Sequence, residues 1–327
     1  MTSWLLRMAI MAGRWFEPTY GGSPGRPDPD LAVVASSQEA ERWLRADADN
    51  WLAALRLASS DGQHALVLDC AESMHWFSDR WMYWPHWLEV FTLGAQAADA
   101  LGDTAQHATQ LNYLAWVHLV PPADLQAVLL MASQVLELAT RSGSRAQIAW
   151  AHQYTGTALR HLGRLSEAAD SLTRSAQLFH TDADIDAYAQ SLNALGDVLA
   201  ADGHREAALE QFRHVMSLLE DENPGMSPDI ASFTRPQTLA RIGHCLSLLG
   251  HPAEAIATLS EAAAGLETFH AFSSQARVLE TLAGVLAEQG RRKESRQTYA
   301  QAAEVFESSG EVEAAGRCRD LAAALTA

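Results

Sequence analysis

The chain has 327 residues, of which 48% are hydrophobic and 19% charged, a balance typical of folded proteins and not of disordered ones. The formal net charge of −17 argues against direct contact with nucleic acid, which requires basic patches. Apolar runs all stop short of the ~18 residues that span a bilayer, so we expect no membrane segment.

The first sixteen residues, MTSWLLRMAIMAGRWF, predict an amphipathic helix. Their large apolar side chains recur at helical spacing: Trp4, Met8, Met11 and Trp15. Arg7 and Arg14 interrupt the apolar stretch, and no basic segment precedes it, which argues against a signal peptide. Residues 17–30, EPTYGGSPGRPDPD, are rich in proline and glycine and predict a loop.

Residues 36–59 predict one or two further helices. Ser36 and Glu39 have the spacing of a capping box, in which each side chain bonds a backbone N–H at the helix start. Residues 63–79 and 85–101 predict a helical hairpin.

The corner of that hairpin reads WFSDRWMYWPHW (76–87) and contains six aromatic residues. Pro85 suits the first turn of a helix, and Trp84, Trp87 and Phe91 share one helix face. We therefore interpret most of these rings as core. The alternative is a surface where another domain docks, with these members: Trp76, Trp81, Tyr83, Trp84 and Trp87. All ten tryptophans lie between residues 4 and 150, so the N-terminal part should pack differently from the rest.

An internal repeat organises the remainder of the chain. Four glycines precede similar strings at steps of 40, 47 and 40 residues: Gly163, Gly203, Gly250 and Gly290. A small residue follows each glycine by five positions: Ala168, Ala208, Ala255 and Ser295. A large residue follows by nine: Leu172, Phe212, Leu259 and Tyr299. Another small residue precedes by seven: Gly156, Gly196, Gly243 and Ala283.

Small residues let paired helices approach closely, large ones fill the space one turn away, and the glycine ends the first helix. Each repeat is thus predicted to be a helical hairpin, and the pattern resembles the tetratricopeptide repeat. The longer step predicts longer helices. Tyr113, Ala115 and Trp116 begin an earlier, degenerate unit with Pro121–Pro122 at its corner.

These observations predict an all-α fold, a right-handed α-solenoid of about six tetratricopeptide-like hairpins with an atypical tryptophan-rich N-terminal part. We divide it into an N-terminal part (1–102), the repeats (103–310) and a capping helix (311–327).

The N-terminal third carries a second resemblance. It contains RWFEP, then AERWLRADADNWLAALRLA (40–58), then PHWL and AADALGD (97–103). This order resembles the C-terminal region of large actinobacterial antibiotic-regulatory transcription factors with a STAND-type ATPase core. The resemblance implies that the chain is the sensor arm, which holds an upstream NB-ARC ATPase inactive until a signal binds. No phosphate-binding G-x-x-x-x-G-K-[ST] loop is present, and the apolar first helix favours a piece cut from a longer regulator.

The sequence offers no catalytic arrangement, and we expect no cofactor. Its thirteen histidines form no H-E-x-x-H, and no serine lies in a G-x-S-x-G turn. The run DADID (182–186) is similar to a calcium loop, but Ala187 and Asn193 replace its glycine and glutamate, so we interpret it as an acidic helix start. Cys70, Cys245 and Cys318 lie far apart and fit buried thiols in a reducing cytoplasm.

The expected binding surface is the concave groove lined by the first helix of each hairpin. The repeat register places these residues on it: Asn112, Trp116, Gln153, Thr157, Arg160, Asn193, Asp197, Arg241, His244, Arg277 and Glu280. Asn112 and Asn193 could hold a peptide backbone, because an amide both donates and accepts, and Arg160 and Arg241 could pair with a carboxylate. The alternative is ordinary solvated polarity.

The leading hypothesis is a non-enzymatic sensor region of a STAND-type regulator that binds a protein, peptide or small effector. A free-standing peptide receptor is the second, and a helical scaffold for other proteins or an enzyme on a helical framework are further alternatives.

Overall fold

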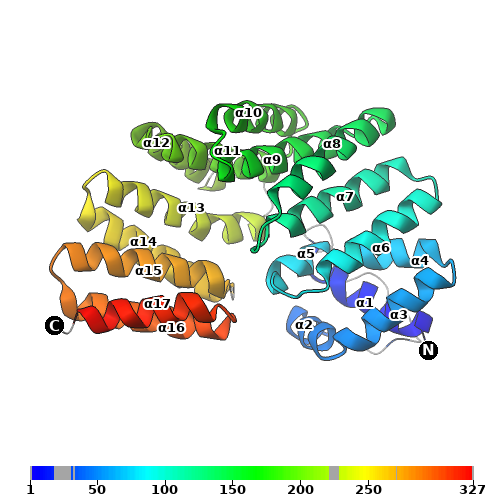
Figure 1. Ribbon diagram of the computed structural model, residues 1–327, viewed down its shortest axis with the longest axis horizontal. Helices are drawn as coiled ribbons and strands as arrows, with labels where there is room; N and C mark the ends of the chain where they lie inside the picture. Colours follow the sequence, from blue (N-terminus) through cyan, green and yellow to red (C-terminus); the bar gives the residue numbers. More distant parts are fainter. Residues whose placement is uncertain (1, 18–30, 32–33, 221–227, 270, 326–327) are drawn as a thin grey trace. The chain divides into compact units, whose positions relative to one another are not determined.

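The computed structural model describes residues 2–17, 31, 34–220, 228–269 and 271–325. Within these residues the chain forms seventeen α-helices, one short 3-10 helix and no β-strand (Figure 1). The predicted loop over 17–30 lies outside the described residues, apart from Glu17.

The helices have the following bounds: α1 Thr2–Arg14, α2 Ser37–Ala46, α3 Ala48–Ser60, α4 His64–Ser73, α5 His75–Ser78, η2 Asp79–Trp81, α6 Trp87–Ala100, α7 Thr104–Leu119, α8 Leu125–Ser142, α9 Arg145–His161, α10 Leu165–Thr181, α11 Ile185–Ala201, α12 Arg205–Glu220, α13 Pro228–Leu248, α14 Pro252–Thr268, α15 Phe272–Glu288, α16 Arg292–Ser308 and α17 Val312–Ala324.

The chain divides into two compact units, unit 1 (Met1–Leu178) and unit 2 (Phe179–Ala327), with the boundary inside α10. The predicted boundaries at residues 102 and 310 stay a prediction.

The first helix of unit 1 is enclosed by its neighbours. α1 packs against α2, α3 and α4, and touches α5. Its buried residues are therefore spread more widely than the predicted stripe: Leu6, Met8, Ala9, Ile10, Ala12 and Gly13. Of the four apolar residues at helical spacing, Met8 is buried and Trp4, Met11 and Trp15 are half-buried, so α1 is amphipathic as predicted.

Helical hairpins follow in order along both units. In unit 1, α4 packs on α6, α6 on α7, α7 on α8 and α8 on α9. In unit 2, each helix from α11 to α17 packs on the next, as the yellow-to-red helices of Figure 1 show. The hairpins α4/α6, α7/α8, α9/α10, α11/α12, α13/α14 and α15/α16 match the predicted number, and α17 is the predicted closing helix.

The predicted glycine terminators end the first helix of each hairpin in a left-handed turn. All four have positive φ, between 72° and 84°. At Gly163 the turn is closed by two hydrogen bonds, from Gly163 N to Arg160 O (3.0 Å) and from Arg164 N to Leu159 O (2.9 Å). This is the Schellman arrangement, in which a residue without Cβ adopts the left-handed conformation at least cost.

The small and large residues of the repeat touch each other. A Cβ added to Gly196 would lie 2.4 Å from the Phe212 ring, and one added to Gly156 would lie 2.5 Å from Leu172 Cγ. A Cβ added to Gly243 would likewise lie 2.6 Å from Leu259 Cγ. The large side chain of the second helix therefore fills the space left by the missing side chain of the first, which confirms the predicted packing.

Two local predictions are confirmed at helix starts, one with a correction. The Ser36 hydroxyl accepts from Glu39 N at 3.2 Å, but the Glu39 carboxylate accepts from Ala35 N at 2.9 Å, one residue earlier than a capping box requires. In the acidic run, Asp184 accepts from Ala187 N at 3.0 Å and caps α11. The three cysteines are buried, as predicted.

Candidate functional site

The first helices of successive hairpins contact one another within each unit. α7 touches α9 in unit 1, whereas α11 touches α13 and α13 touches α15 in unit 2. The repeat places an amide three residues before the small residue of three of these helices: Asn112, Gln153 and Asn193. They are 2%, 8% and 4% exposed, so the structure buries side chains that we predicted to line a solvated groove.

In unit 1, Asn112 joins two first helices. Its Nδ2 donates to the backbone oxygen of Gln147 at 3.1 Å and to Gln147 Oε1 at 2.7 Å. Its own Oδ1 is buried and accepts no hydrogen bond from any described residue, and the same is true of Gln153 Oε1. An enclosed acceptor without a donor costs roughly 1–3 kcal/mol.

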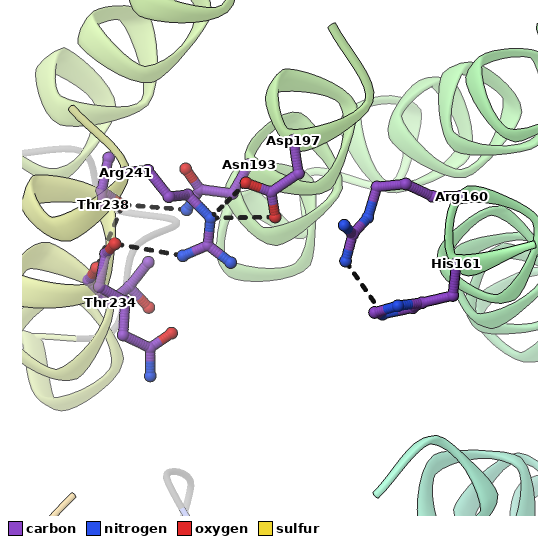
Figure 2. Close-up of polar contacts among 8 residues, drawn as sticks. Arg160, His161, Asn193, Asp197, Thr234, Thr238 and Arg241 are labelled. Carbon is purple, nitrogen blue, oxygen red and sulfur yellow. Dashed lines mark hydrogen bonds and ion pairs between the residues drawn. The ribbon is translucent and has the colours of Figure 1, made fainter. Parts of the chain in front are cut away.

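The other predicted residues of unit 1 are less enclosed. The Thr157 hydroxyl donates to its own helix, at Gln153 O (3.0 Å). Arg160 is half-buried, and its Nη2 lies 3.0 Å from His161 Nε2 on the same helix (Figure 2). Trp116 is half-buried and packs against the core around Tyr154, so its ring has a structural role.

In unit 2, Asn193 and Asp197 are tied to α13. Asn193 Nδ2 donates to Thr238 Oγ1 at 2.9 Å, while Asn193 Oδ1 is buried and no donor among the described residues reaches it. Asp197 pairs with Arg241, with Oδ1 3.0 Å from Nε (Figure 2). Arg241 Nη1 also donates to Gln237 O at 3.2 Å, which fixes the guanidinium between the two helices.

The last predicted residues form similar links. Arg277 Nη2 lies 2.7 Å from Glu311 Oε2, and Glu280 Oε1 lies 4.0 Å from Arg317 Nη2. His244, the remaining predicted residue, is exposed. The predicted arginines Arg241 and Arg277 are therefore held by carboxylates of the chain itself. Among the described residues Arg160 contacts no carboxylate, so it is the predicted arginine best placed to meet a ligand anion.

Sequence reasoning missed the partners of these residues. Gln147, Thr238 and Glu311 follow the residues they bind by 35, 45 and 34 positions, respectively. These separations are close to the repeat step. Polar residues one repeat apart are thus a usable signal for contacts between neighbouring first helices.

The aromatic corner is mostly core, as the packing interpretation predicts. Trp87 is 1% exposed, and its Nε1 donates to Trp81 O at 2.8 Å. Trp84 is also buried, and stacks on the half-buried Trp81 with ring centroids 4.8 Å apart. Trp76 is half-buried against His75, whereas Tyr83 is exposed. A docking surface at this corner stays a prediction, and Trp84 and Trp87 contribute to it only by supporting the others.

Comparison with known proteins establishes the fold. No protein-family model and no curated protein matches this chain. A Rap protein solved in complex with competence and sporulation factor matches with a TM-score of 0.58 and 12% identity, over 99% of this chain and 97% of that one. The chain has a tetratricopeptide-like helical-repeat fold.

Two further structures agree. Aspartyl phosphate phosphatase F of Bacillus subtilis matches with a TM-score of 0.55 and 9% identity, over 100% of this chain and 94% of that one. The Rap conjugation gene regulator of plasmid pLS20, solved with the Phr* peptide, matches with a TM-score of 0.54 and 13% identity, over 98% of this chain and 95% of that one. The predicted all-α solenoid class is confirmed.

The described residues contain no group of three or more His, Cys, Asp or Glu side chains that could hold a metal ion. Nor do they include a helix long and apolar enough to cross a membrane.

Proposed function

We propose that this chain is a non-catalytic recognition protein that binds a peptide segment along the first helices of its hairpins. The tetratricopeptide-like fold supports the proposal, because such hairpins present consecutive parallel helices to a ligand. The structural neighbours solved with competence and sporulation factor and with the Phr* peptide share that fold.

One observation carries the proposal. Asn112, Gln153 and Asn193 occupy the same repeat position, and each has a buried amide oxygen without a donor. The nitrogens of Asn112 and Asn193 are already bound to the next first helix, so what these two side chains can still offer is an acceptor. The backbone N–H groups of an extended peptide would satisfy such acceptors after a small side-chain rotation.

The test compares two buried glutamines whose side-chain oxygens both lack a hydrogen-bond donor. Gln153 and Gln110 both carry a buried oxygen without a donor, but Gln110 lies against Gly94, away from the proposed ligand. Replacing either by methionine keeps the volume and removes the unpaired amide, so neither variant should lose stability.

The immobilised chain would be incubated with a pool of short synthetic peptides, and the retained peptides would be counted by mass spectrometry. We expect Gln153→Met to weaken retention about tenfold, the value of one lost hydrogen bond to a buried acceptor, and Gln110→Met to leave it unchanged. Equal retention by both variants would remove Gln153 from the site. A wild-type chain that retains no peptide would refute the function.

We further propose that binding regulates transcription through an attached module. The resemblance of the N-terminal third favours the sensor region of a STAND-type regulator, with an NB-ARC ATPase as partner. The match over 97% of a Rap chain favours the second candidate, a free-standing receptor. The reading frame upstream of Met1 decides between them: a continuous ATPase frame supports the first, and an in-frame stop codon the second.

A further inference from the structure

Two side-chain contacts between α11 and α13 in unit 2 place Arg241 next to an amide of the proposed site (Figure 2). Asn193 Nδ2 donates to Thr238 Oγ1 at 2.9 Å. One turn further along both helices, Arg241 Nε donates to the two oxygens of Asp197, at 3.0 and 3.2 Å. Residues three or four apart share a helix face, so Arg241 lies about one turn from the Asn193 amide.

The Arg241 guanidinium is held at two of its three nitrogens. Nε binds Asp197, and Nη1 donates to Gln237 O at 3.2 Å, one turn earlier on α13. Among the described residues no acceptor contacts Nη2, which carries two N–H groups. Nη2 is not enclosed, unlike the amide oxygens, and the Arg241 side chain is 32% exposed, so a ligand can reach it. A donor that is already fixed loses little conformational freedom when it binds.

Asp197 already compensates the charge of Arg241. The Asp197 side chain is 25% exposed, so water screens this ion pair only in part. A ligand carboxylate on Nη2 would share one guanidinium with Asp197, and the two like charges would repel each other. A carbonyl oxygen accepts the same N–H bonds and brings no charge. The pair therefore favours a neutral acceptor over an acidic one.

The spacing of the two unpaired groups matches an extended peptide. Asn193 Oδ1 is an acceptor and Arg241 Nη2 a donor, and their residues lie one helical turn apart, about 5.4 Å along the helix pair. The N–H and C=O groups on one edge of an extended chain recur every two residues, about 6.6 Å apart. Main-chain groups occur in every peptide, so these two residues are suited to bind the backbone and not a particular side chain.

We propose that Arg241 is a peptide-binding residue whose Nη2 donates to a main-chain carbonyl, and that Asp197 is a positioning residue that also disfavours acidic groups. The inference rests on the peptide-binding function proposed above. It adds the chemical class of the bound segment, which is an extended peptide that is uncharged where it meets Arg241. Asn193 accepts from an N–H of the same peptide.

The experiment uses the whole chain and paired synthetic peptides that differ by one carboxylate. Each pair has glutamine or glutamate at one position, or an amidated or free carboxyl terminus, and mass spectrometry measures how much of each member the immobilised chain retains. The variants are Arg241→Lys and Asp197→Asn. The controls Arg235→Lys and Glu261→Gln alter a second carboxylate-held arginine of α13, whose Nη1 lies 2.6 Å from Glu261 Oε1 on α14.

Arg241→Lys should weaken retention about two- to tenfold for both members of each pair. Lysine keeps the charge, but a single ammonium cannot bind Asp197 and also present a second fixed donor. Arg235→Lys should leave retention unchanged, because its partner belongs to the second helix of a hairpin. A loss confined to the acidic peptides would show that Arg241 binds a carboxylate, which contradicts the proposal.

Asp197→Asn should produce a gain that a merely structural role does not explain. The asparagine oxygen still accepts from Arg241 Nε, but the guanidinium charge is no longer compensated. The ratio of acidic to neutral peptide retained should therefore rise about threefold or more above the wild-type ratio. Glu261→Gln removes one negative charge as well and should keep the wild-type ratio.

The outcomes separate this inference from the proposed function. Thermal unfolding verifies that each variant folds, and asparagine has the shape of aspartate. If the wild type retains peptides while Arg241→Lys leaves retention unchanged, or Asp197→Asn leaves the ratio unchanged, the inference is wrong and peptide binding stands. If the wild type retains no peptide, the proposed function fails and this inference fails with it.

Discussion

The N-terminal part of unit 1 and the repeats of unit 2 stabilise helical packing with different contacts. Around residues 76–87, helices meet through aromatic rings, and Trp51, Trp84 and Trp87 lie 4.7 to 6.5 Å from one another. In unit 2, Phe212 packs on Gly196, and the ion pair of Asp197 with Arg241 joins consecutive first helices.

The difference follows from the regularity of the chain. Where the repeat step is nearly constant, the same small and large residues meet in every hairpin and close the core. Before residue 103 no such repeat exists, so the spaces between helices are irregular and large rings fill them. Rings that fill irregular spaces are core by necessity, which explains why Phe77, Trp84 and Trp87 of this aromatic segment are buried.

The largest expected effect is the loss of a ring from the aromatic core. Trp87→Ala removes a side chain that is 1% exposed and should destabilise the protein by about 3–5 kcal/mol, because the surrounding rings cannot close the cavity. Urea unfolding, monitored by tryptophan fluorescence, measures this loss of stability. The matched change Tyr83→Ala, at a side chain that is 37% exposed, should cost less than about 0.5 kcal/mol. Equal costs would show that this corner is not a core.

The second effect tests the contact of small and large residues in unit 2. Gly196→Ala places a methyl group 2.4 Å from the Phe212 ring and should cost about 1–3 kcal/mol through overpacking. Adding Phe212→Leu should recover part of that loss in a double-mutant cycle.

Gly284→Ala is the control for Gly196→Ala. Its new methyl group would meet only Tyr299 Oη at 3.6 Å, so the better helix propensity of alanine should stabilise the chain by about 0.5–1 kcal/mol. A destabilised Gly284→Ala would mean that glycine is required throughout these helices, and not only beneath large side chains.

The third effect is a dependence of the protein's stability on pH, which arises from Asp79 in unit 1. Burial raises the pKa of this carboxyl from its usual 3.8 to about 7, so between these values the folded state binds a proton that the unfolded state has released. The stability of the wild type should therefore fall as pH rises through this range. Asp79→Asn should match the wild type near pH 4 and exceed it by about 1–2 kcal/mol at pH 8, after allowance for partial exposure.

Thermal unfolding across pH measures the difference between Asp79→Asn and the wild type. Asp170→Asn, which removes an exposed carboxylate from α10, is the control. If the stability of Asp79→Asn and of the wild type changed with pH in the same way, the Asp79 carboxyl would be solvated and not buried.

The smallest effect concerns the ion pair between first helices in unit 2. Arg241→Ala breaks the contact with Asp197 and should cost about 1 kcal/mol, because the pair is only partly buried. Arg164→Ala, which breaks an exposed pair with Glu167 at the start of α10, should cost less than Arg241→Ala. If both losses are the same in denaturant titrations at low salt, the links between helices add nothing beyond surface pairing.

Much of the fold could be predicted from the sequence because its signals are local. Gly163 and Gly203 end helices through their own backbone conformation, and Ala168 meets Gly156 across a single hairpin. Asp184 caps α11 by a bond to the third residue after it. The amphipathic helix α1 was predicted too, but no local pattern records that four helices contact it.

The candidate site could be predicted only in outline. The repeat register identified the residues of the first helices, but it could not show that Arg241 is held by Asp197 or that Arg160 lacks a carboxylate.

The sequence by itself therefore determined the helices, their pairing into hairpins and the repeat that stacks them, because these depend on interactions within about forty residues. Only the tertiary structure decided which polar atoms are satisfied and which are left without a partner. Hydrogen bonding and desolvation depend on the positions of several helices at once, and a spacing between residues in the chain does not specify those positions.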